Sequence, residues 1–125
     1  MSLTITNTTK GKLPRLPFAK MTEAVLGTEY DCSFVVVSAK KSRELNRIYR
    51  NKDYSTNILS FPLDKTEGEI CIDLTKARSE ASSFDRTYTN FIAFLYIHAL
   101  CHLKGYDHGV KMENLEKKVR AKFNI

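Results

Sequence analysis

The residues best suited to chemistry in this sequence are its three histidines, all within the segment HALCHLKGYDH at 98–108. His98 and His102 are four residues apart, so on a helix they lie one turn apart on the same face. Gly105 can end that helix and turn the chain, which brings His108 in from another direction. Two imidazoles on one helix face and a third from beyond its end suit tetrahedral Zn²⁺. The spacing predicts one zinc ion per chain, bound by His98, His102 and His108.

A zinc site with three protein ligands is typical of catalysis, because the fourth position stays open to water or substrate. Bound Zn²⁺ lowers the pKa of a coordinated water to about 7, so we expect hydrolysis. The spacing also matches the metzincin proteases, but Ala99 stands where their pattern has the general-base Glu, and a peptidase is a distant alternative. Cys101 points away from the histidines and is interpreted as a core residue, with a fourth-ligand role as the less favoured alternative.

The segment that carries the first two histidines, 88–103, is apolar on nearly all faces, which predicts a long helix buried against a sheet. We expect Gly105 to form its left-handed C-cap and Tyr106 to pack back on its last turn. Strands mixed with helices elsewhere favour an α+β fold. The prediction is a single domain over 1–125, with a central mixed β-sheet packed against the long buried helix that carries the metal ligands.

The remaining helices and strands are predicted from hydrophobic periodicity and from the residues that begin or end such elements. Residues 3–8 could form a short edge strand, and a helix is expected from near Pro17 to Gly27. Further strands are predicted at 32–38, at 56–62, ended by Pro62, and at 68–74, with the last two forming a hairpin or lying as neighbours. Two more helices are expected, and their ranges are 73–83 and 111–123.

The segment 39–50, AKKSRELNRIYR, predicts a helix capped by Ser38. Leu45, Ile48 and Tyr49 follow a helical period and are expected to form its inner face. The opposite face is basic, and its cationic residues are Lys40, Lys41, Arg43, Arg47 and Arg50.

Composition favours a polyanionic partner. The 125 residues include 20 Lys and Arg against 14 Asp and Glu, a net charge of +6, so nucleic acid is the first partner to consider. An ordinary basic surface is an equally good explanation of charge alone. The cysteines at 32, 71 and 101 are odd in number and widely spaced, which predicts no disulfides and a reducing, cytoplasmic environment. No stretch is long and apolar enough to predict a membrane span or a signal peptide.

Three motifs in order, LNRIYR, TNILSFP and HALCHLKGYDH, with GEICI as a weaker fourth, resemble the bacterial YbeY family of zinc-dependent endoribonucleases. The resemblance covers 45–108, about half of the chain. It implies an α+β fold, one catalytic zinc on the three histidines, and cleavage of single-stranded RNA in ribosomal RNA maturation and ribosome quality control. The expected partners are single-stranded ribosomal RNA or ribosomal particles, and ribosomal proteins as a further candidate.

The resemblance also implies a catalytic role for Arg50, which ends LNRIYR and matches an arginine that lies near the metal in the family. A guanidinium there can bind a phosphate through two hydrogen bonds and stabilise developing charge. Asp107 matches the family's Asp; it either orients an imidazole through its second nitrogen or caps the turn, and it is also a candidate general base. Asn57 and Ser60 either line the cleft beside the metal or bond to their neighbours.

Three departures from the family pattern concern the site. Ala99 replaces Gly, Cys101 replaces Leu, and the segment after His108 is shorter than usual, which puts the rim of the site in doubt. The methyl group of Ala99 favours helix and need not touch the ligands. The sequence therefore predicts a zinc-dependent endoribonuclease, with a non-catalytic, metal-stabilised ribosome-assembly factor as the alternative.

Overall fold

The computed structural model describes residues 2–125, which form four strands and five α-helices with one short 3-10 helix. In chain order they are β1 (Ser2–Asn7), α1 (Phe18–Leu26), β2 (Asp31–Val36), α2 (Ala39–Arg50), β3 (Ile58–Asp64), β4 (Glu67–Ile72), α3 (Leu74–Glu80), η1 (Ala81–Phe84), α4 (Tyr88–Leu103) and α5 (Val110–Phe123). The α+β class is confirmed.

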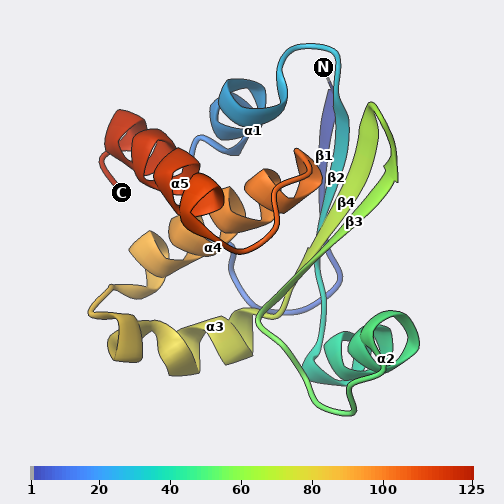
Figure 1. The fold of residues 1–125 in the computed structure, drawn as a ribbon. Coiled ribbons are helices and arrows are strands. Elements are labelled where there is room, and N and C mark those ends of the chain that lie inside the picture. The colour runs from blue at the N-terminus through green and yellow to red at the C-terminus, as the bar shows by residue number, and fades with distance from the viewer. Residues whose placement is uncertain (1) are drawn as a thin grey trace.

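The four strands form one mixed sheet in the order β1-β2-β4-β3 (Figure 1). The first three in this order are parallel, and β3 pairs antiparallel with β4, from Ile58↔Ile72 to Asp64↔Glu67. The predicted edge strand near the N-terminus and the predicted hairpin are both present. Because β3 is the other edge strand, one of its sides is free to border a cleft.

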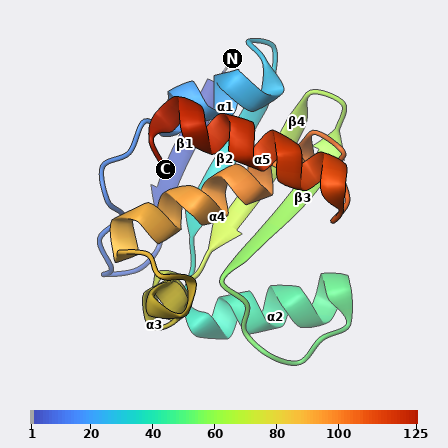
Figure 2. The ribbon, with the colours of Figure 1, turned by 60° about the vertical axis from the view of Figure 1, so that its left-hand side comes forward.

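The main core lies between one face of the sheet and the helices α1, α4 and α5 (Figures 1 and 2). Every second residue of β2 is buried, in keeping with the period of a strand. The rings of Phe18, Phe34 and Tyr96 join α1, β2 and α4, with centroids 4.6 to 5.2 Å apart. This packing fixes α4 against the sheet.

The prediction of a long buried helix at 88–103 is confirmed, because α4 spans Tyr88–Leu103 and most of its residues are buried. Thr87 caps it, accepting a hydrogen bond from the Asn90 amide through its hydroxyl. Its last turn lies close to β4 at Gly68: a Cβ added there would come within 2.9 Å of Leu103 and 2.3 Å of the Tyr30 hydroxyl. Glycine therefore permits the close approach of the histidine-bearing helix to the sheet.

The predicted inner face of α2 is wrong in part. Ile48 and Tyr49 are 58% and 65% exposed, and Leu45 is half-buried. The buried positions are Ser42 and Asn46, which hold the following loop through hydrogen bonds to the carbonyls of Thr56 and Tyr54. A polar contact with the loop has replaced the apolar contact that the periodicity predicted.

Two predicted strand ends also differ. Pro62 does not end β3, which continues to Asp64 with an irregular register after the proline. An edge strand tolerates proline because the missing N–H need not belong to a ladder. The strand β4 ends at Ile72, earlier than expected, because Asp73 becomes the N-cap of α3 and accepts hydrogen bonds from the amides of Thr75 and Lys76.

All three cysteines are free and buried. Within residues 2–125, no helix combines the length and the apolar character that crossing a membrane requires.

Candidate metal centre

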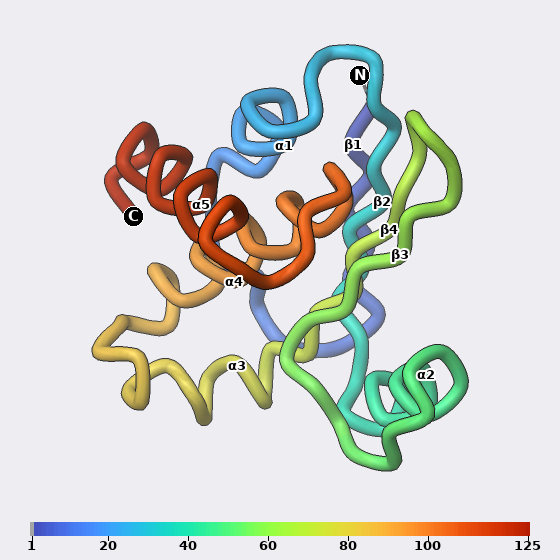
Figure 3. The backbone as a smooth tube through the Cα atoms, viewed as in Figure 1, coloured from blue at the N-terminus to red at the C-terminus, as the bar shows by residue number. Residues whose placement is uncertain are grey.

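The histidines reach one another because a tight turn follows α4. The amide of Gly105 donates to the carbonyl of His102, and the amide of Tyr106 donates to the carbonyl of Cys101, which together form a Schellman motif. Gly105 has φ +108°, a conformation that disfavours any side chain. The chain then turns back into α5 (Figure 3). His108 belongs to this turn, between the end of α4 and the start of α5. The predicted glycine cap is confirmed.

The three imidazoles converge on one point. The Nε2 atom of His108 lies 3.2 Å from Nε2 of His102 and 3.4 Å from Nε2 of His98. Two nitrogens bound to one Zn²⁺ at roughly 2.05 Å and at a tetrahedral angle lie about 3.3 Å apart. The observed spacing therefore fits three ligands of a single metal ion, and His98, His102 and His108 can hold one.

The second nitrogens of two imidazoles are already engaged. Nδ1 of His102 lies 3.0 Å from the carbonyl oxygen of Tyr106, to which it can only donate. Nδ1 of His98 lies 2.8 Å from Oε1 of Glu116 and donates to this carboxylate. In the neutral rings, both Nε2 atoms are then bare acceptors aimed at the same point, and a cation is the partner that such a donor set requires.

Burial, followed by the neighbouring His98, lowers the pKa of His102. The direction of this pKa shift favours metal binding. A lower pKa keeps the imidazole neutral over more of the acidic range, and only a neutral imidazole binds a metal. Desolvation in this pocket therefore favours the ligand form of His102.

Glu116 was missed from sequence. It lies on α5 and is 8% exposed, in line with the buried Met112 and Val119 of the same helix. The signal was available: an acidic residue on the apolar face of an amphipathic helix needs a buried partner. The partner, His98, could not be named, because it belongs to another helix.

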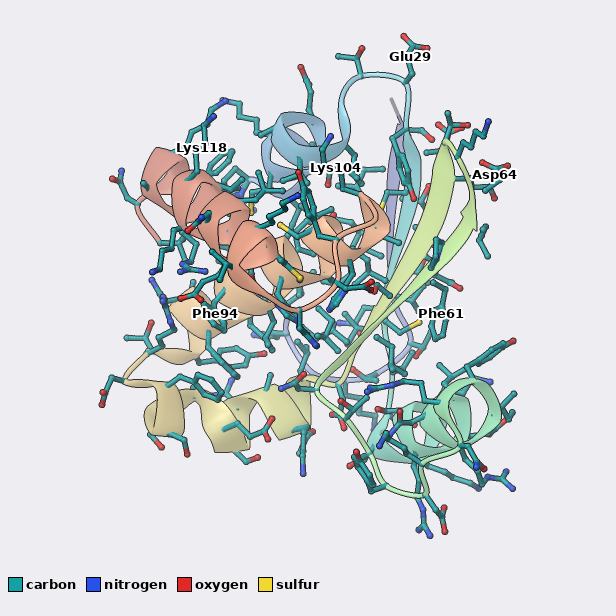
Figure 4. All side chains as sticks on the ribbon, viewed as in Figure 1. Glu29, Phe61, Asp64, Phe94, Lys104 and Lys118 are labelled. Carbon is teal, nitrogen blue, oxygen red and sulfur yellow. The ribbon has the colours of Figure 1, made fainter. Side chains whose placement is uncertain are left out.

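The histidines open into a cavity of about 1030 Å³ between α4, α5 and the edge strand β3. Polar residues of several elements line it, and they include Arg50, Asn57, Ser60, Asp107, Glu113, Glu116 and Arg120. Figure 4 shows Phe94, on α4, and Phe61, on β3, on opposite sides of this region. The metal centre is thus open to a large ligand.

The structure brings the predicted site residues to one cavity, although each has different surroundings. Arg50 lies at the exposed end of α2 and lines the cavity with the histidines. Asp107 is exposed and, among residues 2–125, its carboxylate has no hydrogen bond to a histidine. The imidazole-orienting role that the sequence allowed for Asp107 falls instead to Glu116 and the carbonyl of Tyr106.

The structure also gives the positions of the other residues that the sequence singled out. Asn57 and Ser60 line the cavity, and the Asn57 amide in addition donates to Glu80 over 2.9 Å. Cys101 is fully buried in the core, and burial raises the pKa of its thiol to about 12. A buried neutral thiol on the far side of the helix is a core residue, as expected. Ala99 is buried beside the cavity, so no carboxylate follows His98.

The chain matches a family model described as "Endoribonuclease YbeY" over residues 5–124. Among proteins of that name, one from Alkaliphilus metalliredigens is 37% identical over 103 residues, which cover 74% of this chain and 66% of the relative. A Solibacter usitatus protein is 37% identical over 107 residues, covering 82% and 71% of the two chains. One from Paraburkholderia phytofirmans is 33% identical over 126 residues, covering 93% and 82%.

A Thermotoga maritima protein with a known solution structure has a similar fold, with a TM-score of 0.66 and 25% identity over 98% of this chain and 91% of that one. The family model reaches both sides of the histidine motif, including the strands and α5, where the sequence motifs alone stopped at His108. From this match over nearly the whole chain, together with the converging histidines, we conclude that the chain belongs to the YbeY family.

Proposed function

We propose that this protein is a metal-dependent endoribonuclease that cleaves single-stranded RNA in ribosomal RNA maturation and ribosome quality control. The observation that carries the proposal is the convergence of three imidazole nitrogens in an open cavity that also contains Arg50. The relatives named as endoribonucleases support it. Ribosomal RNA or ribosomal particles, and in addition ribosomal proteins, are the proposed partners, and the cytoplasm is the proposed compartment.

We propose Zn²⁺, one ion per chain, as the metal. A ligand set of three imidazoles without a carboxylate or thiolate suits zinc, and three protein ligands leave a position for substrate. When bound, the ion would supply Lewis-acid polarisation of a phosphoryl oxygen and a water of lowered pKa. His98, His102 and His108 would hold it, and Glu116 and the Tyr106 carbonyl would keep two of the rings in the binding tautomer.

Arg50 and Asp107 are the proposed catalytic side chains. The guanidinium of Arg50 would bind the scissile phosphate and stabilise the charge that develops on its oxygens. In residues 2–125, neither Arg50 nor Asp107 takes part in a salt bridge, so both are available to a substrate. The carboxylate of Asp107 lines the same cavity and would accept a proton there.

Paired cleavage assays at matched metal loading test the proposal, using a single-stranded RNA with wild type, His102→Ala and Arg50→Ala. We expect His102→Ala to lose metal and activity. Arg50→Ala should keep the metal and lose about 10²- to 10³-fold in kcat, the usual effect of removing one group that stabilises transition-state charge. Arg47→Ala is the matched control, since Arg47 is on the same helix but does not line the cavity.

Equal activity of wild type and His102→Ala, or full activity after thorough metal removal, would contradict the proposal. If His102→Ala were inactive but still bound precursor ribosomal particles and restored growth, the non-catalytic assembly factor would be the better description.

A further inference from the structure

The cavity contains an aromatic pair, the exposed Tyr49 and the half-buried Phe61, that the metal centre does not use. Tyr49, at the end of α2, is 65% exposed, and its ring lies 5.1 Å from that of Phe61 on β3, at an interplanar angle of 59°. Both residues line the cavity that holds the histidines. The helical period predicted a core position for Tyr49. The packing of α2 does not explain why this side chain is exposed instead.

The other exposed aromatic residue of the cavity, Phe84, does have a packing explanation. Phe84 is 50% exposed, but its ring is stacked on that of Phe91 at 4.9 Å, and Phe91 is fully buried. Phe84 therefore covers the main core. Tyr49 has Phe61 as its one aromatic neighbour among residues 2–125, and most of its surface faces solvent.

The surroundings of the pair suit a polyanion with planar groups. Arg50 follows Tyr49 directly on α2 and lines the same cavity. The acidic side chains of this helix and its loop are already partnered: Asp53 binds Arg43 at 2.9 Å, and Glu44 lies 3.7 Å from Lys41. A free guanidinium group beside an aromatic pair with one exposed ring is the combination that binds a phosphate backbone and stacks its bases.

The size of the cavity agrees with a large ligand. Its lining includes Arg120 on α5, the three histidines, residues of the edge strand β3, and Tyr49 on α2. A volume of about 1030 Å³ is at the upper limit for a compact small-molecule site. An RNA strand with one phosphate at the metal centre has Tyr49 in the same cavity to receive one of its bases.

We propose that Tyr49 and Phe61 form a base-stacking subsite for single-stranded RNA next to Arg50, an inference that rests on the proposed function. Stacking requires an unpaired base, so the subsite selects single strands over duplexes. The subsite contacts the substrate away from the reacting phosphate. It therefore determines the affinity for RNA and not the rate of the chemical step.

Anisotropy measurements with a short single-stranded RNA and an abasic strand of the same length test the subsite, with each probe checked by gel to be intact. We expect Tyr49→Ala to weaken RNA binding about five- to hundredfold, the usual range for loss of one stacked base. Tyr49→Phe should bind as wild type does, because the ring is kept. The abasic strand should bind equally to wild type and Tyr49→Ala.

Tyr54→Ala is the matched control, since Tyr54 is 54% exposed and lies outside the cavity lining, and it should bind RNA as wild type does. Phe61→Leu provides a second test of the pair, and thermal unfolding of each variant verifies the fold. Unchanged RNA binding by Tyr49→Ala, or an equal loss for the abasic strand, would overturn the subsite. Failure of the metal-loaded wild type to cleave RNA would instead refute the proposed function, since the subsite is judged by binding.

Discussion

At the scale of single residues, the metal centre depends on groups that do not themselves bind metal. The Glu116 carboxylate and the Tyr106 carbonyl hold the Nδ1 protons of His98 and His102, so that Nε2 of each ring faces the common point. A carboxylate partner also makes the imidazole a stronger ligand. Of these two groups only Glu116 is a side chain, so it can be altered without changing a ligand.

Replacing Glu116 by Ala should lower metal affinity about 10- to 100-fold, because His98 loses the partner that fixes its tautomer. Glu116→Gln should lose less, since its amide oxygen can still accept the Nδ1 proton. Affinity is measured by competition with a chromophoric chelator, which needs no enzymatic activity. Glu113→Gln is the control: Glu113 is on the same helix and at the same cavity, but it pairs with Lys117 at 3.2 Å. Equal affinity of wild type and Glu116→Ala would show that the contact does not support the site.

At the scale of elements, the site depends on how closely α4 lies against β4. Gly68 has no Cβ where Leu103 and the Tyr30 hydroxyl pass over the strand. Leu103 directly follows His102, so a displaced helix end would move a ligand as well. The GEICI segment, which looked like the weakest of the family motifs, therefore has a packing role.

Gly68→Ala should destabilise the protein by about 1–3 kcal/mol, the usual cost of overpacking a core, measured by chemical denaturation. In a Tyr30→Phe background the loss should be smaller, because the nearest atom to the new methyl group, the Tyr30 hydroxyl oxygen, is gone. Tyr30→Phe alone serves as the reference. Equal losses in both backgrounds would mean that the hydroxyl does not oppose the methyl group.

At the scale of the whole molecule, the sheet has buried cysteines on both of its faces. Cys32 and Cys101 belong to the main core, and Cys71 belongs to a smaller cluster with Val37 and Leu59. Burial, as the largest cause, raises the pKa of Cys32 to about 11 and the pKa of Cys71 and Cys101 to about 12. The reactive thiolate is thus suppressed throughout the folded protein.

We therefore expect the native protein to react very slowly with a thiol reagent at pH 8. With a pKa of about 11, about one thiol in a thousand is ionised there, and burial blocks even that fraction. In denaturant all three thiols should react at once. Rapid modification of one cysteine in the native state would show that a part of the core opens readily.

The sequence predicted most of what is local. The spacing of His98 and His102, the glycine after their helix and the alternation in the strands all act over a few residues, so the helix, its cap and the converging ligands could be predicted. The errors at Tyr49 and Pro62 both arise where an element lacks a neighbour, which the sequence does not reveal. Periodicity shows which residues can face a core, but α2 has little core to face at Tyr49, and β3 is an edge strand, so proline need not end it.

By itself, the sequence determined three histidines able to bind one metal ion, the helix that carries two of them and the α+β class. Only the tertiary structure decided the order of the strands, the contact of Glu116 with His98, and the meeting of Arg50 and Tyr49 with the metal centre in one cavity. The physical reason is distance along the chain. Local steric and hydrogen-bonding rules act within one element, whereas the placement of α2, α4 and α5 around one cavity depends on how the whole core packs.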